Sequence, residues 1–373
     1  MKECFVVEQK KFLSFLSAMQ PICAKRTTLE ATSTILFQVG HKELVLKATD
    51  LEISLQASYA VKDTSLQTTH TFLVSGKRIF DLVKELEGDI TCTITDNQLL
   101  LQANKVNLSL NIRDAQDFPP FPERIENLMQ FNSQHLLNML SKVAFLIPQN
   151  NANPALNGLF VEVSETGCTM TATDGHCLAQ VLSSSYSMSE PKKWLLPRRA
   201  IFEVKKILES CQDNTIFLGV CKNQFVFSGD SFNFFTKLLA DNFPHYANIL
   251  EKTDFMPARI DRSQLVKTLR RSACLLSGQF IATRFEVAKE VVKVSMLNKE
   301  VGTLEEEIPL HDFNGNEMSI RFYAPYLLSG LQVLQDETVQ LYLKNASKPI
   351  IFETDAPDCK TVYLVMPVAP THG

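Results

Sequence analysis

Glycine is scarce in this sequence: 13 of its 373 residues are glycine, about half the usual frequency. The two closest glycines are Gly167 and Gly175. A phosphate-binding loop needs clustered glycines, because their backbone N–H groups must converge on the anion without side chains in the way. The sequence therefore contains neither a P-loop nor a Rossmann dinucleotide motif.

The nine cysteines are scattered, and no pair has CxxC spacing. HExxH and GxSxG motifs are also absent, so we expect no metal site, no cofactor and no serine-hydrolase elbow. An odd number of scattered thiols is typical of a reduced compartment. No apolar run is long enough for a membrane span or a secretion signal. We expect a cytoplasmic protein without a membrane partner.

Hydrophobic residues make up 45% of the chain and charged residues 21%, as in a folded globular protein. A chain of 373 residues is longer than one ordinary domain. The formal net charge of −4 excludes a uniformly basic protein. It leaves room for one basic surface that is balanced by acidic residues elsewhere.

The chain contains an internal repeat. Several segments return after about 120 residues in the same order. The matching pairs are Lys47–Leu55 with Thr171–Ala179, Leu73–Leu86 with Trp194–Ile207 (and, more weakly, Ile320–Leu334), and Asp117–Pro122 with Asn242–Tyr246. Their agreement predicts three related units that fill the chain.

Each repeat has the same internal order of helices and strands. Amphipathic spacing predicts opening helices over Gln9–Met19, Ser133–Phe145 and Arg262–Leu275, with Ser133 as an N-cap. A second helix follows a turn that bears Gly76, Pro197 or Pro325. Alternating strands are predicted at Glu43–Lys47, Ile53–Tyr59, Ile90–Ile94, Val106–Ile112, Ile216–Val220 and Val339–Leu343. The fold class is α+β, with three similar domains at residues 1–124, 125–251 and 252–373.

Basic residues concentrate on the polar faces of these helices, whereas acidic residues lie more in strands and turns. If the helices shared one side, that side would bind phosphates without reading bases. A solvated helix face is the alternative explanation of the same pattern. Few aromatic residues interleave with these charges, which favours duplex over single-stranded DNA.

Short motifs connect the repeat to a known family. They are Thr49–Glu52, Thr173–His176, Leu156–Gly158, Asp117–Pro119, Phe243–Pro244 and Val365–Val368. In this order and spacing the chain resembles, over its full length, the bacterial DNA polymerase III beta subunit family of sliding clamps. The resemblance implies a non-catalytic, ring-shaped, head-to-tail homodimer. In such a ring, two helices per domain pack on antiparallel sheets and face double-stranded DNA. The DNA is bound without regard to its base sequence.

The resemblance also implies which residues approach DNA. By position these are Arg26, Lys77, Arg78, Arg198 and Arg199. The charge of the helix faces adds Lys10, Lys11, Lys142, Arg270 and Arg271.

A second implied site is an apolar cleft that binds short peptides of partner proteins. The expected partners are the DNA polymerase III catalytic subunit, the clamp loader and other proteins with a clamp-binding motif. The matching positions, here called the cleft residues, are Leu156, Thr173, Gly175, His176, Leu178, Pro244, Ile249, Tyr326, Ser347, Pro349, Leu364, Met366 and Pro367. Most are apolar or small, as a groove for a hydrophobic anchor requires.

The family also implies where the subunits of the ring meet. Lys105, Leu108 and Leu110 of one subunit would contact Leu275, Leu276, Glu305, Glu306 and Glu307 of the other. The charges of the two sets are complementary. A solvated strand end is the alternative interpretation of the glutamate run.

Two other functions stay open on the sequence alone. Cys177, Asn153–Ala155 and the tail after Pro367 depart from the family pattern around the cleft, which suits an accessory clamp for repair or a mobile element. A hydrolase that uses Asp174, His176 and Cys177 is the third hypothesis.

Overall fold

The computed structural model describes residues 3–23, 29–122, 125–211, 213–278, 280–357 and 359–369. The chain forms two compact units, each described here by itself. The first unit comprises Met1–Leu137 and Arg199–Leu238, and the second comprises Asn138–Arg198 and Leu239–Gly373. This division cuts across the middle third of the chain, so the three-domain division stays a prediction.

The first unit is built on one sheet of 13 strands whose neighbours all pair antiparallel. Along the sheet the order is β10-β15-β16-β17-β4-β3-β2-β6-β9-β8-β7-β1-β5. The strands are β1 (Cys4–Glu8), β2 (Thr34–Val39), β3 (Glu43–Thr49), β4 (Ile53–Ala60), β5 (Asp63–Thr64), β6 (His70–Ser75), β7 (Asp89–Ile94), β8 (Gln98–Ala103), β9 (Val106–Asp114), β10 (Glu126–Asn132), β15 (Thr215–Cys221), β16 (Gln224–Ser228) and β17 (Phe232–Lys237).

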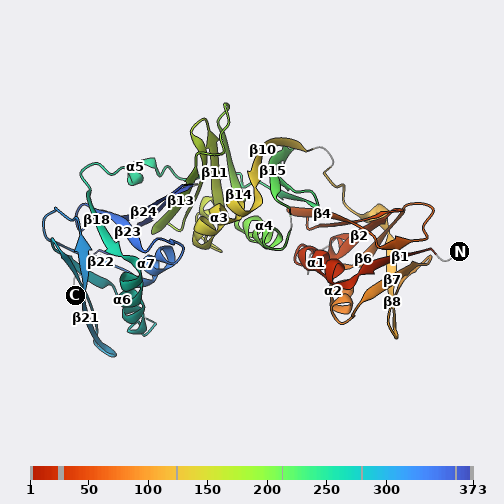
Figure 1. Ribbon diagram of the computed structural model, residues 1–373, viewed down its shortest axis with the longest axis horizontal. Coiled ribbons are helices and arrows are strands. Elements are labelled where there is room, and N and C mark those ends of the chain that lie inside the picture. Colours follow the sequence, from red (N-terminus) through yellow and green to blue (C-terminus); the bar gives the residue numbers. More distant parts are fainter. Residues whose placement is uncertain are drawn as a thin grey trace. The chain divides into compact units, whose positions relative to one another are not determined.

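Helices α1 (Gln9–Met19) and α2 (Gly76–Lys84) lie side by side against this sheet (Figure 1). Helix α1 buries Phe12, Leu16 and Met19, which recur at the three- and four-residue spacing of one helical face. Phe37 of the sheet receives them: its ring lies 6.1 Å from that of Phe12 and 5.5 Å from that of Phe72. The apolar stripe thus fixes which helix face turns inward and leaves the lysines outside.

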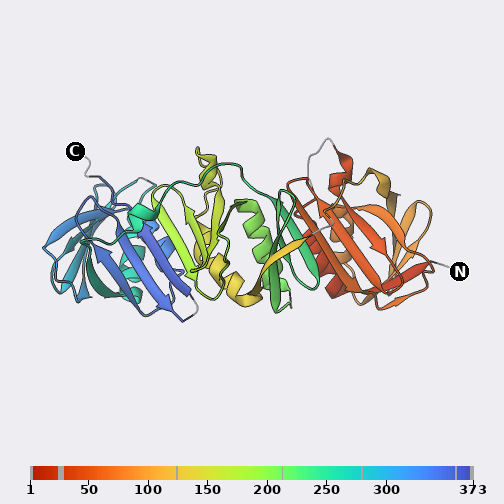
Figure 2. The ribbon, with the colours of Figure 1, turned by 90° about the horizontal axis from the view of Figure 1, so that it is seen from above.

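The second unit repeats this design with a sheet of 12 antiparallel strands, in the order β14-β11-β12-β13-β25-β24-β23-β18-β21-β20-β19-β22. Figure 2 shows the strands of each sheet running side by side. They are β11 (Gly158–Ser164), β12 (Gly167–Thr173), β13 (Cys177–Ser183), β14 (Lys192–Pro197), β18 (Met256–Asp261), β19 (Thr283–Val287), β20 (Val291–Asn298), β21 (Gly302–His311), β22 (Met318–Phe322), β23 (Thr338–Leu343), β24 (Ile350–Ala356) and β25 (Cys359–Val365).

Helices α6 (Arg262–Cys274) and α7 (Ala324–Leu331) pack together in the second unit, which also holds the short α5 (Ala247–Leu250). Gly330 of α7 is required by packing, because a Cβ atom there would overlap the buried Tyr363 ring. The remaining helices, α3 (Ser133–Val143) and α4 (Arg198–Ser210), have residues in both units. Single 3₁₀ turns cover Glu30–Ser33, Ala115–Asp117, Ala144–Leu146 and Pro154–Leu156.

The predicted helices and strands are confirmed, with boundary shifts of a few residues. The predicted N-cap of α3 is wrong: Asn132, not Ser133, accepts a hydrogen bond from the backbone N–H of His135, at 3.0 Å. An Asn in this position satisfies an otherwise free N–H of the first helical turn. Ser133 is buried instead.

The two sheets with their packed helices make an α+β protein, as predicted. In the described part of the chain, no helix has both the length and the apolar character needed to cross a membrane.

Candidate DNA surface, partner cleft and subunit edges

Four of the predicted DNA-binding residues are exposed cations that lie on helices and form no ion pair within the described residues. They are Lys10 of α1, Lys77 and Arg78 of α2, and Arg270 of α6. Their charge is therefore available to an external anion such as a phosphate.

Lys142 does not fit the prediction of a DNA-facing lysine. Its side chain is buried, and Nζ donates to Sγ of Cys359 at 2.9 Å. The residue lies in the last turn of α3, next to the buried Val143. Helix-face charge alone misassigned it, because a lysine stem can lie among apolar side chains when its amine finds a partner.

Three further predicted cations are already engaged inside the protein. Arg199 pairs with Asp50 and donates to the Pro21 carbonyl at 3.0 Å. Arg271 pairs with Glu306 at the end of α6. Lys11 pairs with Glu8 at 3.4 Å and remains exposed.

Arg198 is half-buried, and its Nε donates to the Ile147 carbonyl at 2.8 Å. Arg26, the remaining predicted contact, lies outside the described residues.

The turn at Thr173–Cys177, which carries three of the cleft residues, is held by four hydrogen bonds from two side chains. Oδ1 of Asp174 accepts the backbone N–H groups of His176 and Cys177 at 2.8 and 2.7 Å. The hydroxyl of Thr173 donates to the Cys177 carbonyl at 2.6 Å and accepts the N–H of Gly175 at 3.1 Å. Gly175 has φ +94°, a backbone conformation that residues with a side chain rarely adopt. These bonds fix the sharp turn and leave His176 exposed on it.

Below this turn lies an apolar cluster. Leu178 of β13 pairs in register with Leu364 of β25, and both are buried. They pack with Ile351 and Val362, while Tyr246, Leu250, Phe255 and Tyr342 pack against the cluster from its side. Leu178 and Leu364 therefore form the floor beneath the other cleft residues rather than their exposed surface.

The exposed rim of the cleft residues is both aromatic and apolar. The rings of His176 and Tyr326 stack at 5.5 Å. Met366 donates its backbone N–H to the His176 carbonyl at 2.9 Å, which ties the end of β25 to the turn. Met366 and Ile249 are 37% and 43% exposed, so both present apolar surface to solvent.

The other cleft residues occupy different positions around this turn. Leu156 is buried, with Cδ1 4.0 Å from the position a Cβ of Gly175 would occupy. Pro349 is buried and precedes β24, whereas Ser347 and Pro244 are exposed. Pro367 is half-buried after Met366. The structure thus brings the turn, Leu156, the floor, Tyr326 and Met366 together most tightly.

Sequence reasoning missed two aromatic residues beside this site, Phe280 and Tyr323. Phe280, which is 60% exposed, stacks on Tyr323 at 4.5 Å. Tyr323 contacts Tyr326 at 5.0 Å and so continues the row of rings to His176. No short motif marks Phe280, because the residue lies in the segment between α6 and β19 and its ring partner Tyr323 comes from a distant part of the chain.

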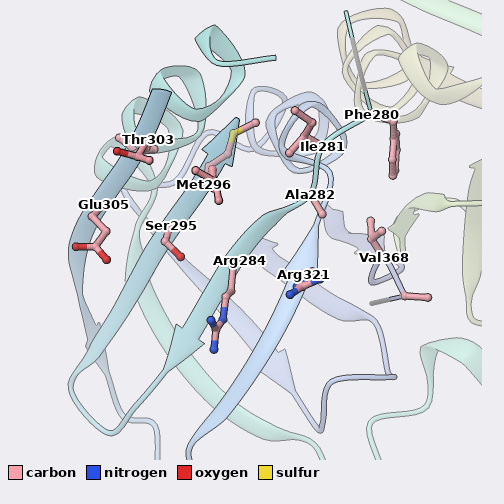
Figure 3. Close-up of a pocket in the computed structure, with 13 residues that line it drawn as sticks. Phe280, Ile281, Ala282, Arg284, Ser295, Met296, Thr303, Glu305, Arg321 and Val368 are labelled. Carbon is pink, nitrogen blue, oxygen red and sulfur yellow. The ribbon is translucent and has the colours of Figure 1, made fainter. Parts of the chain in front are cut away.

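Phe280 also lines a cavity of about 730 Å³ on the second unit. In Figure 3, Arg284, Ser295 and Glu305 project from neighbouring strands, and Phe280 and Val368 lie at one end. Thr303 and Glu305 on β21 form the opposite wall. This cavity therefore adjoins the predicted subunit edge and does not coincide with the cleft residues.

The proposed nucleophile of the hydrolase hypothesis is inaccessible. Cys177 is 1% exposed, and burial raises the pKa of its thiol from 9.0 to about 12. A thiol with so high a pKa carries almost no thiolate at neutral pH. Asp174 holds the turn, and His176 stacks on Tyr326, so neither is arranged around Cys177 as a base.

Besides the strands at the ends of the two sheets, β9 and β21 each have an edge that is partly without a partner among the described residues. Val106–Asn111 of β9 pairs with β8 only, because β6 takes up just Ile112–Asp114. Gly302–Pro309 of β21 pairs with β20 only, because β18 takes up just Leu310 and His311. Such edges present a row of free N–H and C=O groups to another strand.

The predicted interface residues lie on or near these edges. Leu108 and Leu110 are half-buried on β9, and Lys105 is exposed just before it. Leu275 and Leu276 are half-buried after α6. Glu305 pairs with Lys293 at 3.0 Å, and Glu306 pairs with Arg271, so only Glu307 of the three glutamates forms no ion pair within the described chain.

Comparison with known proteins explains this combination of surfaces. The family models for the N-terminal, central and C-terminal domains of the DNA polymerase III beta subunit match residues 3–122, 130–245 and 250–369. The chain belongs to the DNA polymerase III beta subunit family. Its members are the bacterial sliding clamps, which are non-catalytic processivity factors.

Full-length relatives and solved structures agree. The chain is 27% identical to the beta sliding clamp of Pseudomonas aeruginosa over 369 residues, covering 98% of this chain and 99% of that one. It is 23% identical to the beta sliding clamp of Staphylococcus aureus, covering 98% of each.

The solved DNA polymerase III subunit beta of Pseudomonas aeruginosa superposes with a TM-score of 0.89 at 25% identity, over 98% of this chain and all of that one. The Bacillus subtilis sliding clamp gives a TM-score of 0.91 at 19% identity, over 99% and 100%. These matches support the function of a DNA sliding clamp. They favour neither the hydrolase hypothesis nor a specialised accessory role of the clamp.

Proposed function

We propose that this protein acts as a head-to-tail ring dimer that encircles duplex DNA and tethers the replicative polymerase. The observation that carries this proposal is the match to the three beta-subunit domains, in order, across nearly the whole chain. The proposal includes the three clamp domains at residues 1–124, 125–251 and 252–373 and a cytoplasmic location.

Duplex DNA is held by weak phosphate contacts from the helices. Lys10, Lys77, Arg78 and Arg270 support this role, because they are exposed cations without an intramolecular ion pair among the described residues. Phosphate contacts carry no sequence information, so they permit movement along the duplex. Arg199 contributes after it leaves Asp50, and Lys142 contributes nothing because it is buried.

Partner proteins insert an apolar side chain beside the Thr173–Cys177 turn. The exposed Met366 and Ile249 and the His176–Tyr326 ring pair support this docking role. Methionine adapts its shape to different ligands, which suits a surface shared by a polymerase, a clamp loader and other clamp-binding proteins.

The ring closes when the free edge of β9 in one subunit pairs with the free edge of β21 in the other. Both edges have unpaired backbone groups over several residues. A head-to-tail contact of this kind generates a closed ring when the rotation between subunits fits. Lys105 and Glu307 supply opposite charges at this contact.

The decisive experiment measures retention on DNA. The protein is loaded onto nicked circular DNA with a bacterial clamp loader and ATP, washed in high salt, and measured again after the circle is cut. We expect retention on circles and loss on linear DNA, because an encircling ring slides off a free end. Equal retention on both forms would show ordinary electrostatic binding and contradict the proposal.

A variant series tests the phosphate contacts. The double variant Lys77→Ala with Arg78→Ala removes both cations. The slope of log binding constant against log salt concentration should become less steep by about 0.9 for each phosphate that is no longer neutralised. Lys289→Ala is the matched control, because Lys289 is an exposed lysine in a strand turn away from the helices. An unchanged slope in the double variant would remove these two residues from the DNA surface.

A further inference from the structure

The turn that carries the cleft residues has a counterpart in the first unit. Thr49–Ile53 corresponds to Thr173–Cys177 in the internal repeat. Oδ1 of Asp50 accepts the N–H groups two and three positions further on at 3.0 and 2.8 Å, as Asp174 does. The hydroxyl of Thr49 donates to the Ile53 carbonyl and accepts the N–H of Leu51 at 3.1 Å, as Thr173 does with its own neighbours.

The strand register beyond the turn is also the same. Ile53 of β4 pairs with Thr236 of β17, as Cys177 of β13 pairs with Val365 of β25. Lys237 then donates its backbone N–H to the Glu52 carbonyl at 3.0 Å. Met366 makes the equivalent bond in the second unit, so Lys237 occupies the place of Met366.

An apolar floor lies under this second turn as well. Phe235, the counterpart of Leu364, packs with Cys221 and Val226, and Phe121 and Ile125 pack against them. The Phe121 ring meets the Phe235 ring edge-on at 5.4 Å. Phe121 corresponds in the repeat to Tyr246, which packs beside Leu364.

A cavity opens at this place in the first unit. It has a volume of about 480 Å³, and its lining includes Leu51, Phe121, Pro122, Lys222, Lys237 and Leu238. We call it the first-unit groove. Leu51 is 46% exposed and has φ +76°, a conformation that is rare for a residue with a bulky side chain.

Charge around the first-unit groove is mainly positive. Lys222 is exposed and has no ion pair among the described residues. Lys47 Nζ lies 5.4 Å from the centre of the Phe121 ring. Lys237 pairs with Glu52 at 2.9 Å, and both side chains are about half or more exposed, so this pair can open.

We propose that the first-unit groove is a second docking site, which takes an extended peptide of a partner protein with an apolar residue next to an acidic one. The apolar side chain packs between Leu51 and Phe121, and the carboxylate pairs with Lys222. Charge complementarity selects this occupant over a neutral peptide, since three lysines and one unburied glutamate surround an apolar floor, and Asp50 of the same turn is paired with Arg199. A peptide as the occupant rests on the proposed function of the cleft residues, whereas the groove itself does not.

Photo-crosslinking localises the binding without any substitution. The probe is a synthetic hexapeptide that contains two aspartates and a diazirine analogue of leucine, and its companion has asparagine in place of both aspartates. After irradiation of the full-length protein, mass spectrometry maps the adducts. We expect the acidic probe to label Pro120–Pro122 or Lys222–Gln224, with at least about threefold less labelling by the neutral companion.

Each other outcome of this experiment is informative. Labelling confined to His176–Leu178 and Val365–Pro367 would overturn the second site while supporting the cleft. Labelling of the first-unit groove alone would contradict the cleft and leave the second site standing. Equal labelling by the neutral companion, or displacement of the acidic probe by a duplex oligonucleotide more readily than by unlabelled peptide, would overturn the proposed occupant.

Variants of the groove test the same contacts by affinity. In a background with Met366→Asp, which blocks the cleft, Leu51→Ser and Lys222→Glu should each weaken binding of a fluorescein-labelled acidic probe by at least about fivefold. Leu29→Ser and Lys42→Glu are the matched controls, because Leu29 is 40% exposed and Lys42 is exposed, both outside the groove. Circular dichroism establishes that each variant is folded. Unchanged affinity in folded Leu51→Ser and Lys222→Glu would overturn the proposal.

Discussion

The turns at Thr49–Ile53 and Thr173–Cys177 share a backbone and differ in the side chains on their rims. Both use an aspartate and a threonine to bind the same backbone groups, and both have a residue at positive φ. The rim of the first turn consists of Leu51 and Glu52, together with Lys237 of the neighbouring strand β17. The second carries glycine, histidine and methionine at the same places.

This difference shows how a repeated frame acquires separate ligand preferences. The hydrogen bonds of the turn need only the Thr-Asp pair, so the repeat preserves the frame through a few short-range contacts. The side chains of the rim take no part in the hydrogen bonds of the turn, so they are free to differ. A charged rim in the first unit and an apolar rim in the second therefore suit different peptides on the same type of backbone.

The largest expected effect concerns the floors under the two turns. Phe235→Ala should lower the free energy of unfolding by about 3–5 kcal/mol, and Leu364→Ala by about 2–5 kcal/mol, because each leaves a cavity. Urea-induced unfolding measures both. Leu364→Met is the volume-conserving control, with a cost below about 1.5 kcal/mol. A decrease of under about 1 kcal/mol at either floor would show that the two floors are not equivalent cores.

Alkaline pH should affect the stability of the two turns differently, because only the second turn ends in a thiol, that of Cys177. The pKa of Cys177 is raised from 9.0 to about 12, so between these values the folded state retains a proton that the unfolded state releases. The free energy of unfolding therefore falls as pH rises from 9 to 12, by up to about 1.4 kcal/mol per pH unit from this group.

Cys177→Ala should reduce that alkaline slope, measured by urea unfolding at several pH values. Its counterpart Ile53→Ala, which removes no titrating group, should lower stability without changing the slope. An identical slope in Cys177→Ala and the unmodified protein would contradict the role of this thiol.

Exchange of the residues at positive φ should have an asymmetric effect. Gly175→Leu should cost about 1–2 kcal/mol, because a side chain at φ +94° is strained. Leu51→Gly should change stability by less, since relief of strain is offset by about 0.5–1 kcal/mol of additional entropy in the unfolded chain. Thermal denaturation compares the two. A strong decrease in stability of Leu51→Gly would mean that the leucine packs against the fold.

The smallest expected effect is at the turn aspartates. Asp50→Asn should cost up to about 1 kcal/mol, since it removes the charge that faces Arg199 while keeping the acceptor oxygen. Asp174→Asn should cost less, because Asp174 forms no ion pair among the described residues. A double-mutant cycle with Arg199→Gln isolates the pair. Additive effects in that cycle would show that the Asp50–Arg199 ion pair is not stabilising.

Local patterns in the sequence predicted most of the fold. Apolar spacing placed α1 at its observed limits, Gln9–Met19, and located β7 and β23 within one residue. These elements are decided by neighbours in the chain. The prediction of Ser133 as the N-cap of α3 was wrong, because Asn132 and Ser133 are adjacent and both residue types cap helices well.

The site was predicted less completely, for a different reason. The Thr-Asp turn was visible as a motif, but burial of Lys142 beside Cys359 depends on residues far apart in the chain. The ion pairs that engage Arg199 and Arg271 are likewise long-range. The charge of a helix face in the sequence predicts the sign of the surface. It does not predict which of its cations are already bound in ion pairs or buried.

The sequence by itself determined the family, the threefold repeat and the absence of phosphate-loop and zinc motifs, because these follow from residue types at fixed spacing. Only the tertiary structure decided that Phe121 lies against Phe235, that Leu51 is exposed above them, and that β9 and β21 keep free edges. Those features arise when strands from distant segments pair in one register. Spacing along the chain does not encode which edge remains open after that pairing.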